Sequence, residues 1–152
     1  MRQEERWYWS ACVGEEGQAY VELLLVLFLI LLFVSGILFF GRVLYVGIAL
    51  DAAAADAARA SVETLNDWRG IPQGIEAAQR TLRGYYLDPA AAGIRVAPLA
   101  GWTYGYPVRS DVSYRTYVGD IPFVGWFYPD QTLRLHSTVF LRVEEFKSRW
   151  AW

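Results

Sequence analysis

An uninterrupted apolar run near the N-terminus is the feature that most constrains this chain. Residues 23–40 read LLLVLFLILLFVSGILFF, and nineteen uncharged positions separate Glu22 from Arg42. At about 1.5 Å per helical residue these positions span roughly 28 Å, close to the ~30 Å hydrocarbon core of a bilayer. The run therefore predicts a helix that crosses a membrane once, over about residues 20–41.

Two other interpretations of the N-terminal region fit the residues less well. A cleaved secretory signal has an apolar region of only about 7 to 15 residues, which follows a basic start and ends at a small-residue cut site. A lipoprotein modified at Cys12 would need an apolar stretch before that cysteine, and none is present. Basic residues flank the run on both sides, so their count does not orient the helix in the membrane.

The predicted helix continues beyond the membrane. Residues 46–68 are rich in alanine and free of proline, and Arg59 and Glu63 have the i,i+4 spacing of a helical ion pair. We expect one long helix over about residues 18–69, ended by Gly70 and Pro72. The alanines either form a close-packing surface for neighbouring helices or fill exposed turns.

The remainder of the chain predicts a small mixed domain. Residues 73–87 carry apolar side chains at helical spacing, which indicates a short second helix. Residues 94–99, 108–118 and 132–144 alternate at period two, as half-buried strands do. The fold class is thus α+β, with a long N-terminal transmembrane helix extending into a domain that has a short helix and a three- to four-stranded antiparallel sheet.

An unusually apolar connection joins the last two predicted strands. Residues 119–130 read GDIPFVGWFYPD, although loops are normally polar. Its large side chains form a candidate contact surface for a membrane or a partner protein. The same side chains could instead cover the core of their own domain. The four residues of this surface are Phe123, Trp126, Phe127 and Tyr128.

Enzyme chemistry has no starting point in the sequence. The only histidine, His136, lies on the polar side of a predicted strand, and the single cysteine excludes a thiolate metal cage. Asp111 and Asp120 fit solvated charges better than a catalytic pair, and nucleotide, zinc and nucleophile motifs are absent. With 14 basic and 16 acidic residues, the charge does not favour nucleic acid as a partner. We expect no enzyme activity, cofactor, metal or small-molecule substrate.

The junction before the apolar run carries a recognisable pattern. Gly17-Gln18-Ala19-Tyr20-Val21-Glu22 resembles the class III leader site of type IV pilins and their relatives. Residues 41–61, GRVLYVGIALDAAAADAARAS, are similar to the membrane-exit segment of TadE and TadG family proteins, and residues 112–145 are similar to the late strands of that family. The resemblance covers nearly the whole chain after Gly17.

The resemblance implies a minor pseudopilin, or pilus-assembly protein, of a tight-adherence (Flp-type) secretion system that builds an adhesive pilus. Residues 1–17 would be a leader cut between Gly17 and Gln18 by a prepilin peptidase, and Glu22 would act in assembly. Residues 18–69 would form the long helix and residues 70–152 an exported domain. The protein would be a single-pass protein of the bacterial inner membrane, with its N-terminus cytoplasmic and its C-terminal domain periplasmic. Its partners would be membrane lipid, other pilins and membrane platform proteins.

A second hypothesis rests on two departures from the family pattern. The leader ends Glu15-Glu16-Gly17 instead of being basic, and Leu23 stands where tight-adherence pilins carry an aromatic residue. The alternative is an uncleaved single-pass scaffold or accessory protein of the cell envelope. An intact N-terminus in purified protein would favour this alternative.

Overall fold

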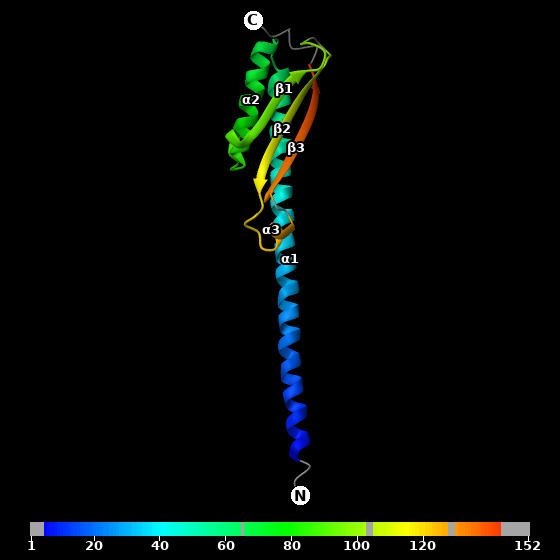
Figure 1. Cartoon of the computed structure of the whole chain (residues 1–152). Coiled ribbons are helices and arrows are strands. Elements are labelled where there is room, and N and C mark those ends of the chain that lie inside the picture. The colour runs from blue at the N-terminus through cyan, green and yellow to red at the C-terminus, as the bar shows by residue number, and fades with distance from the viewer. Residues whose placement is uncertain (1–4, 65, 103–104, 128–129, 144–152) are drawn as a thin grey trace.

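One long helix organises the whole molecule. The computed structural model describes residues 5–64, 66–102, 105–127 and 130–143. Helix α1 (Glu5–Val62) has 58 residues, a length of about 87 Å. Within those described ranges it is the one helix long and apolar enough to cross a membrane. Its N-terminal part projects away from the rest of the chain, and all other elements gather around its C-terminal part (Figure 1).

The end of α1 differs from the sequence prediction. The helix ends at Val62, not near residue 69, and α2 (Asp67–Gly84) begins before Gln73. The Thr64 hydroxyl donates to the Ser61 carbonyl oxygen at 2.9 Å, which satisfies one of the carbonyl groups left open at the helix end. The turn is tied down by the indole N–H of Trp102, which donates to the Thr64 carbonyl at 3.1 Å.

Gly70 and Pro72 therefore lie inside α2 and do not stop α1. A Cβ on Gly70 would collide with the Trp102 ring and the Thr64 hydroxyl, so this glycine allows close packing. Pro72 is near the start of α2, where it removes one backbone donor from the helix. Packing across the turn thus overrides two residues that normally break helices.

A three-stranded antiparallel sheet follows the two helices. A short 3₁₀ turn, η1 (Pro89–Ala91), leads into β1 (Ala92–Pro98), β2 (Pro107–Tyr117) and β3 (Thr132–Arg142), which are ordered β1-β2-β3. In the register, Ile94 pairs with Val112, and Val112 pairs with Ser137. The predicted α+β class and its three strands are confirmed.

The core lies where α1 and α2 cover one face of the sheet. Helix α1 packs on β2 and β3, and α2 packs on β1 and on α1. A Cβ on Gly74 of α2 would lie 2.8 Å from the Ala57 carbonyl oxygen, so the two helix backbones approach closely. The alanines of α1 are thus a close-packing surface, used by a helix of the same chain, and the interpretation as exposed turns is wrong. Five of them are fully buried: Ala49, Ala53, Ala54, Ala57 and Ala58.

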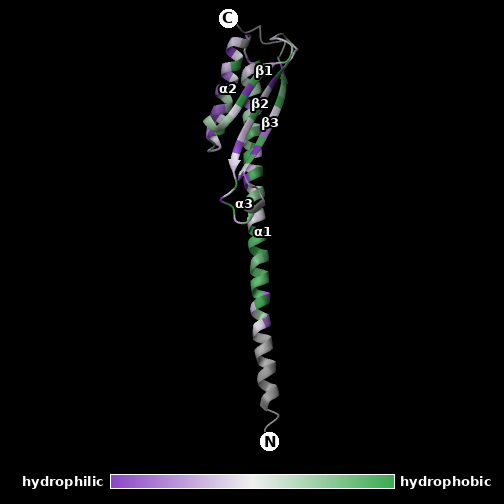
Figure 2. Ribbon diagram, viewed as in Figure 1, coloured by the Kyte–Doolittle hydropathy of each residue, from purple (hydrophilic) through white to green (hydrophobic). Residues whose placement is uncertain are grey.

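The molecule has two parts, a head and a stem. The head comprises residues 46–62 of α1 together with α2 and the sheet, and the stem comprises residues 17–44 of α1. Between Glu22 and Arg42, hydrophobic residues follow one another along the stem, whereas hydrophilic and hydrophobic residues are mixed in the head (Figure 2). Large apolar side chains are exposed along most of the stem, as expected of a helix whose surroundings are lipid.

Candidate membrane and assembly surface

The predicted processing junction lies within continuous helix. Gly17 and Gln18 are exposed residues of α1, and the helix passes through them without a break. Glu22 is also exposed, one turn further along and directly before the apolar run. The three residues therefore lie together at the start of the stem, far from the head (Figure 1).

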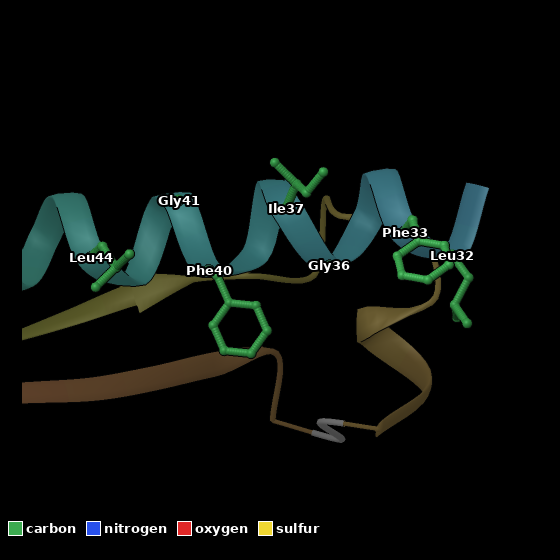
Figure 3. Close-up of a pocket in the computed structure, with 7 residues that line it drawn as sticks. All are labelled: Leu32, Phe33, Gly36, Ile37, Phe40, Gly41 and Leu44. Atoms are coloured by element: carbon green, nitrogen blue, oxygen red, sulfur yellow. The ribbon is translucent and has the colours of Figure 1, made fainter. Parts of the chain in front are cut away.

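An apolar groove runs along one side of the stem (Figure 3). A Cβ on Gly36 or on Gly41 would have no neighbour within 4 Å, so the backbone is open to an approaching chain at both positions. At 3.6 residues per turn the groove lies roughly opposite the side of α1 that faces the head. It is lined by Leu32, Phe33, Gly36, Ile37, Phe40, Gly41 and Leu44.

The connection between β2 and β3 runs from residue 118 to residue 131, and its described part packs on the stem through residues 122–124. The Phe123 ring contacts the Phe28 ring edge-on, with centroids 5.5 Å apart and planes at 81°. Ser35 is buried although it belongs to the apolar run. A second apolar groove lies between the two segments and is lined by Leu32, Ser35, Gly36, Phe39, Pro122, Phe123 and Val124.

The predicted contact surface is only partly described by the structure. Phe123 is half-buried against the stem. Trp126 and Phe127 belong to the single helical turn α3 (Val124–Phe127), but their side chains lie outside the described part, as does all of Tyr128. The surface as a whole therefore stays a prediction, and Phe123 is its one member whose contact is known.

Arg42 links the stem, the sheet and the connection. Its Nη1 donates to the Asp120 carboxylate at 2.6 Å and to the Tyr117 carbonyl oxygen at 2.8 Å. The hydrogen bond from Arg42 holds the pKa of Asp120 below its ordinary value of 3.8. In the sequence, Arg42 stands out only as the charge that ends the apolar run. Its partner lies 78 residues later in the chain, and no local pattern pairs the two.

Two of the residues considered for catalysis, Asp111 and His136, lie on strands β2 and β3. Asp111 accepts hydrogen bonds from Arg109 at 2.9 Å and from the Thr138 hydroxyl at 2.6 Å. His136 is exposed on β3, opposite Ser113. In the described ranges no three histidine, cysteine or acidic side chains come together as a metal site would require. The features that the structure gathers are apolar surfaces along a membrane-crossing helix.

That arrangement agrees with a family match. Residues 17–59 match the family of TadE-like proteins. The TadE-like segment begins at Gly17 and ends within the buried alanines of the head, so it includes the whole stem. The match agrees with the resemblance to TadE-like proteins seen in the residues around Gly17 and Glu22. Searches of curated proteins and of solved structures gave no match.

Proposed function

We propose that this protein is a minor pseudopilin that assembles an adhesive pilus in a tight-adherence (Flp-type) secretion system. The carrying observation is the match of residues 17–59 to TadE-like proteins over a stem that leads without interruption into a folded head. The stem anchors the chain in the inner membrane, with the N-terminus cytoplasmic and the head on the outer side. Prepilin peptidase, other pilins and the membrane platform proteins are its proposed partners.

The proposed role of Glu22 follows from its position. An ionised carboxylate at the edge of a bilayer is costly unless a cation pairs with it. The next basic residue along the helix is Arg42, at the other end of the apolar run. Cutting after Gly17 would create an α-amino group on Gln18, four residues and about one helical turn from Glu22. That amine can pair with Glu22 of the same chain or of a neighbour in a growing filament.

The test is to replace Glu22 and to measure insertion, processing and piliation together. Glu22→Ala should leave the membrane fraction and removal of the leader intact and abolish surface pili, while Glu22→Asp should retain part of the piliation. Asp51→Ala is the matched control, because Asp51 is an exposed carboxylate of the same helix outside the membrane. Normal piliation of Glu22→Ala would refute the assigned role, and an unprocessed N-terminus in the wild-type protein would favour the uncleaved scaffold.

A further inference from the structure

We propose that residues 121–127 of the connection between β2 and β3 are immersed in the membrane, among lipid acyl chains, which they enter from the side of the head. This proposal goes beyond pilus assembly and does not depend on it. It requires only that α1 crosses a bilayer while the connection keeps the contacts it makes with the stem.

The depth of the connection is set by the residues it touches. Phe28 lies fourteen positions before Arg42, or about 21 Å along the helix axis. Ser35, which the connection helps to bury, lies seven positions before Arg42, or about 10 Å. If Arg42 marks the membrane boundary on the side of the head, Phe123 reaches past the middle of a hydrocarbon core about 30 Å thick.

Placing the membrane at another position along α1 leads to the same conclusion about the connection. If the bilayer ended before Phe28, only the five uncharged residues after Glu22 would lie inside it, which is about 8 Å of helix. If the bilayer ended before Ser35, twelve uncharged residues would lie inside it, which is about 18 Å of helix. Neither length crosses the core, and extending the span towards the N-terminus would bury Glu15, Glu16 and Glu22 at high cost. Helix α1 can therefore cross the membrane and keep its contacts with the connection only if the connection is immersed.

The chemistry of the connection suits an apolar surrounding. Residues 121–127 read IPFVGWF and carry no charge, and the flanking Asp120 is held by Arg42 at the boundary. Backbone groups without partners are not tolerated in lipid, and turns in this connection provide partners for some of them. The Ile121 N–H donates to the Val118 carbonyl oxygen at 3.3 Å. The Val118 N–H donates to the Gln131 carbonyl at 2.8 Å, and the Val124 N–H donates to the Ile121 carbonyl at 3.2 Å.

Phe123 adds a conformational observation. Its φ of 65° lies in the left-handed region, which is uncommon for an aromatic residue. Such backbone conformations persist when surrounding contacts impose them, and here the ring meets Phe28 on the stem. The connection is thus held against the stem at two points, by Arg42 near the head and by Phe28 further into the apolar run.

Depth-dependent quenching tests the proposal on the purified full-length chain in liposomes. In a Cys12→Ser background, a fluorophore is attached to Pro122→Cys or to Phe123→Cys and exposed either to lipids brominated on the acyl chains or to aqueous iodide. Pro122→Cys is the decisive variant because it retains the Phe123 ring. Brominated lipid should quench both probes several-fold more than a probe at Leu99→Cys, an exposed position just after β1. Iodide should show the reverse order.

A probe at Ile30→Cys, on the exposed surface of the stem, is the control for insertion and must be quenched by lipid in every sample used. Iodide quenching of the Pro122→Cys probe as strong as that at Leu99→Cys would overturn the proposal, since the connection would then have left the stem for water. Protection from both quenchers would overturn it as well, because a protein surface and not lipid would cover the connection. No pilus machinery is present, so a failure here leaves the proposed function untouched.

Discussion

The stem and the upper part of α1 are one helix in two different surroundings. In the stem, leucine, isoleucine and phenylalanine side chains point outward on most sides. In the head, the side of α1 that packs against α2 and the sheet carries Leu50 and five alanines whose side chains are fully buried. The size of the side chains along α1 thus depends on what surrounds the helix. Large residues fill the surface where lipid can adapt to them, and small residues stand where another backbone must approach closely.

The side of the stem that faces the head is the exception. There Ser35 is buried and Phe39 is half-buried, because the connection between β2 and β3 lies against them. The Ser35 hydroxyl donates to the Leu31 carbonyl oxygen at 2.8 Å, so its polar group is satisfied within the helix. Leu32 and Gly36 line both grooves, and beyond them the other groove of the stem continues to Gly41 and Leu44.

The largest expected difference between the two parts comes from the same substitution made in each. Leu50→Ala removes a fully buried side chain from the core of the head and should lower the free energy of unfolding by about 2–5 kcal/mol. Leu31→Ala removes a side chain that is 45% exposed in the stem. This substitution should change the free energy of unfolding by less than about 0.5 kcal/mol. Thermal unfolding of the head in one detergent measures both. Equal losses would show that the stem is packed like the head.

A pair of glycines sharpens the comparison at the level of the backbone. Gly74→Ala places a Cβ 2.8 Å from the Ala57 carbonyl oxygen and should destabilise the head by about 1–3 kcal/mol. Gly36→Ala adds a Cβ with no neighbour within 4 Å, and alanine favours the helix by up to about 1 kcal/mol. The melting temperature should therefore fall for the first variant and stay or rise slightly for the second. A fall in both would contradict the open backbone at Gly36.

The smallest expected effect concerns pH, which should act on the head and not on the apolar run. Hydrogen bonds from Thr138 and Arg109 lower the pKa of Asp111 from its ordinary 3.8. A lowered pKa contributes stability that is present above the unfolded value, and this contribution is lost as the pH falls from about 4 through the folded value. Because Asp111 is partly exposed, solvent screening keeps the contribution well below about 1 kcal/mol.

Asp111→Asn should accordingly flatten the dependence of head stability on pH below about pH 4 and leave the stability near pH 7 slightly reduced. Chemical unfolding at several pH values measures this. Arg134→Gln, an exposed charge change on β3, is the control that should leave the slope unchanged. An unaltered slope for Asp111→Asn would show that its hydrogen bonds do not persist in solution.

The sequence was most informative where a pattern is local. The apolar run, the alternation of the three strands and the residues from Gly17 to Glu22 each carry their own periodicity or spacing, and the membrane-crossing helix, the sheet and the TadE-like match follow from them. The prediction for the end of α1 is wrong because Gly70 and Pro72 lie inside α2. Gly70 packs against Trp102, a contact between distant parts of the chain that a local window of sequence does not contain.

The amino-acid sequence by itself determined that this chain has one long apolar helix joined to a small α+β head, because hydropathy and periodicity are properties of neighbouring residues. Only the tertiary structure decided what the helix touches. The pairing of Arg42 with Asp120 and of Phe28 with Phe123 joins segments some 80 to 95 residues apart. Such contacts depend on how the sheet packs on α1. The tertiary fold therefore determines that the apolar connection lies against the apolar run of the helix.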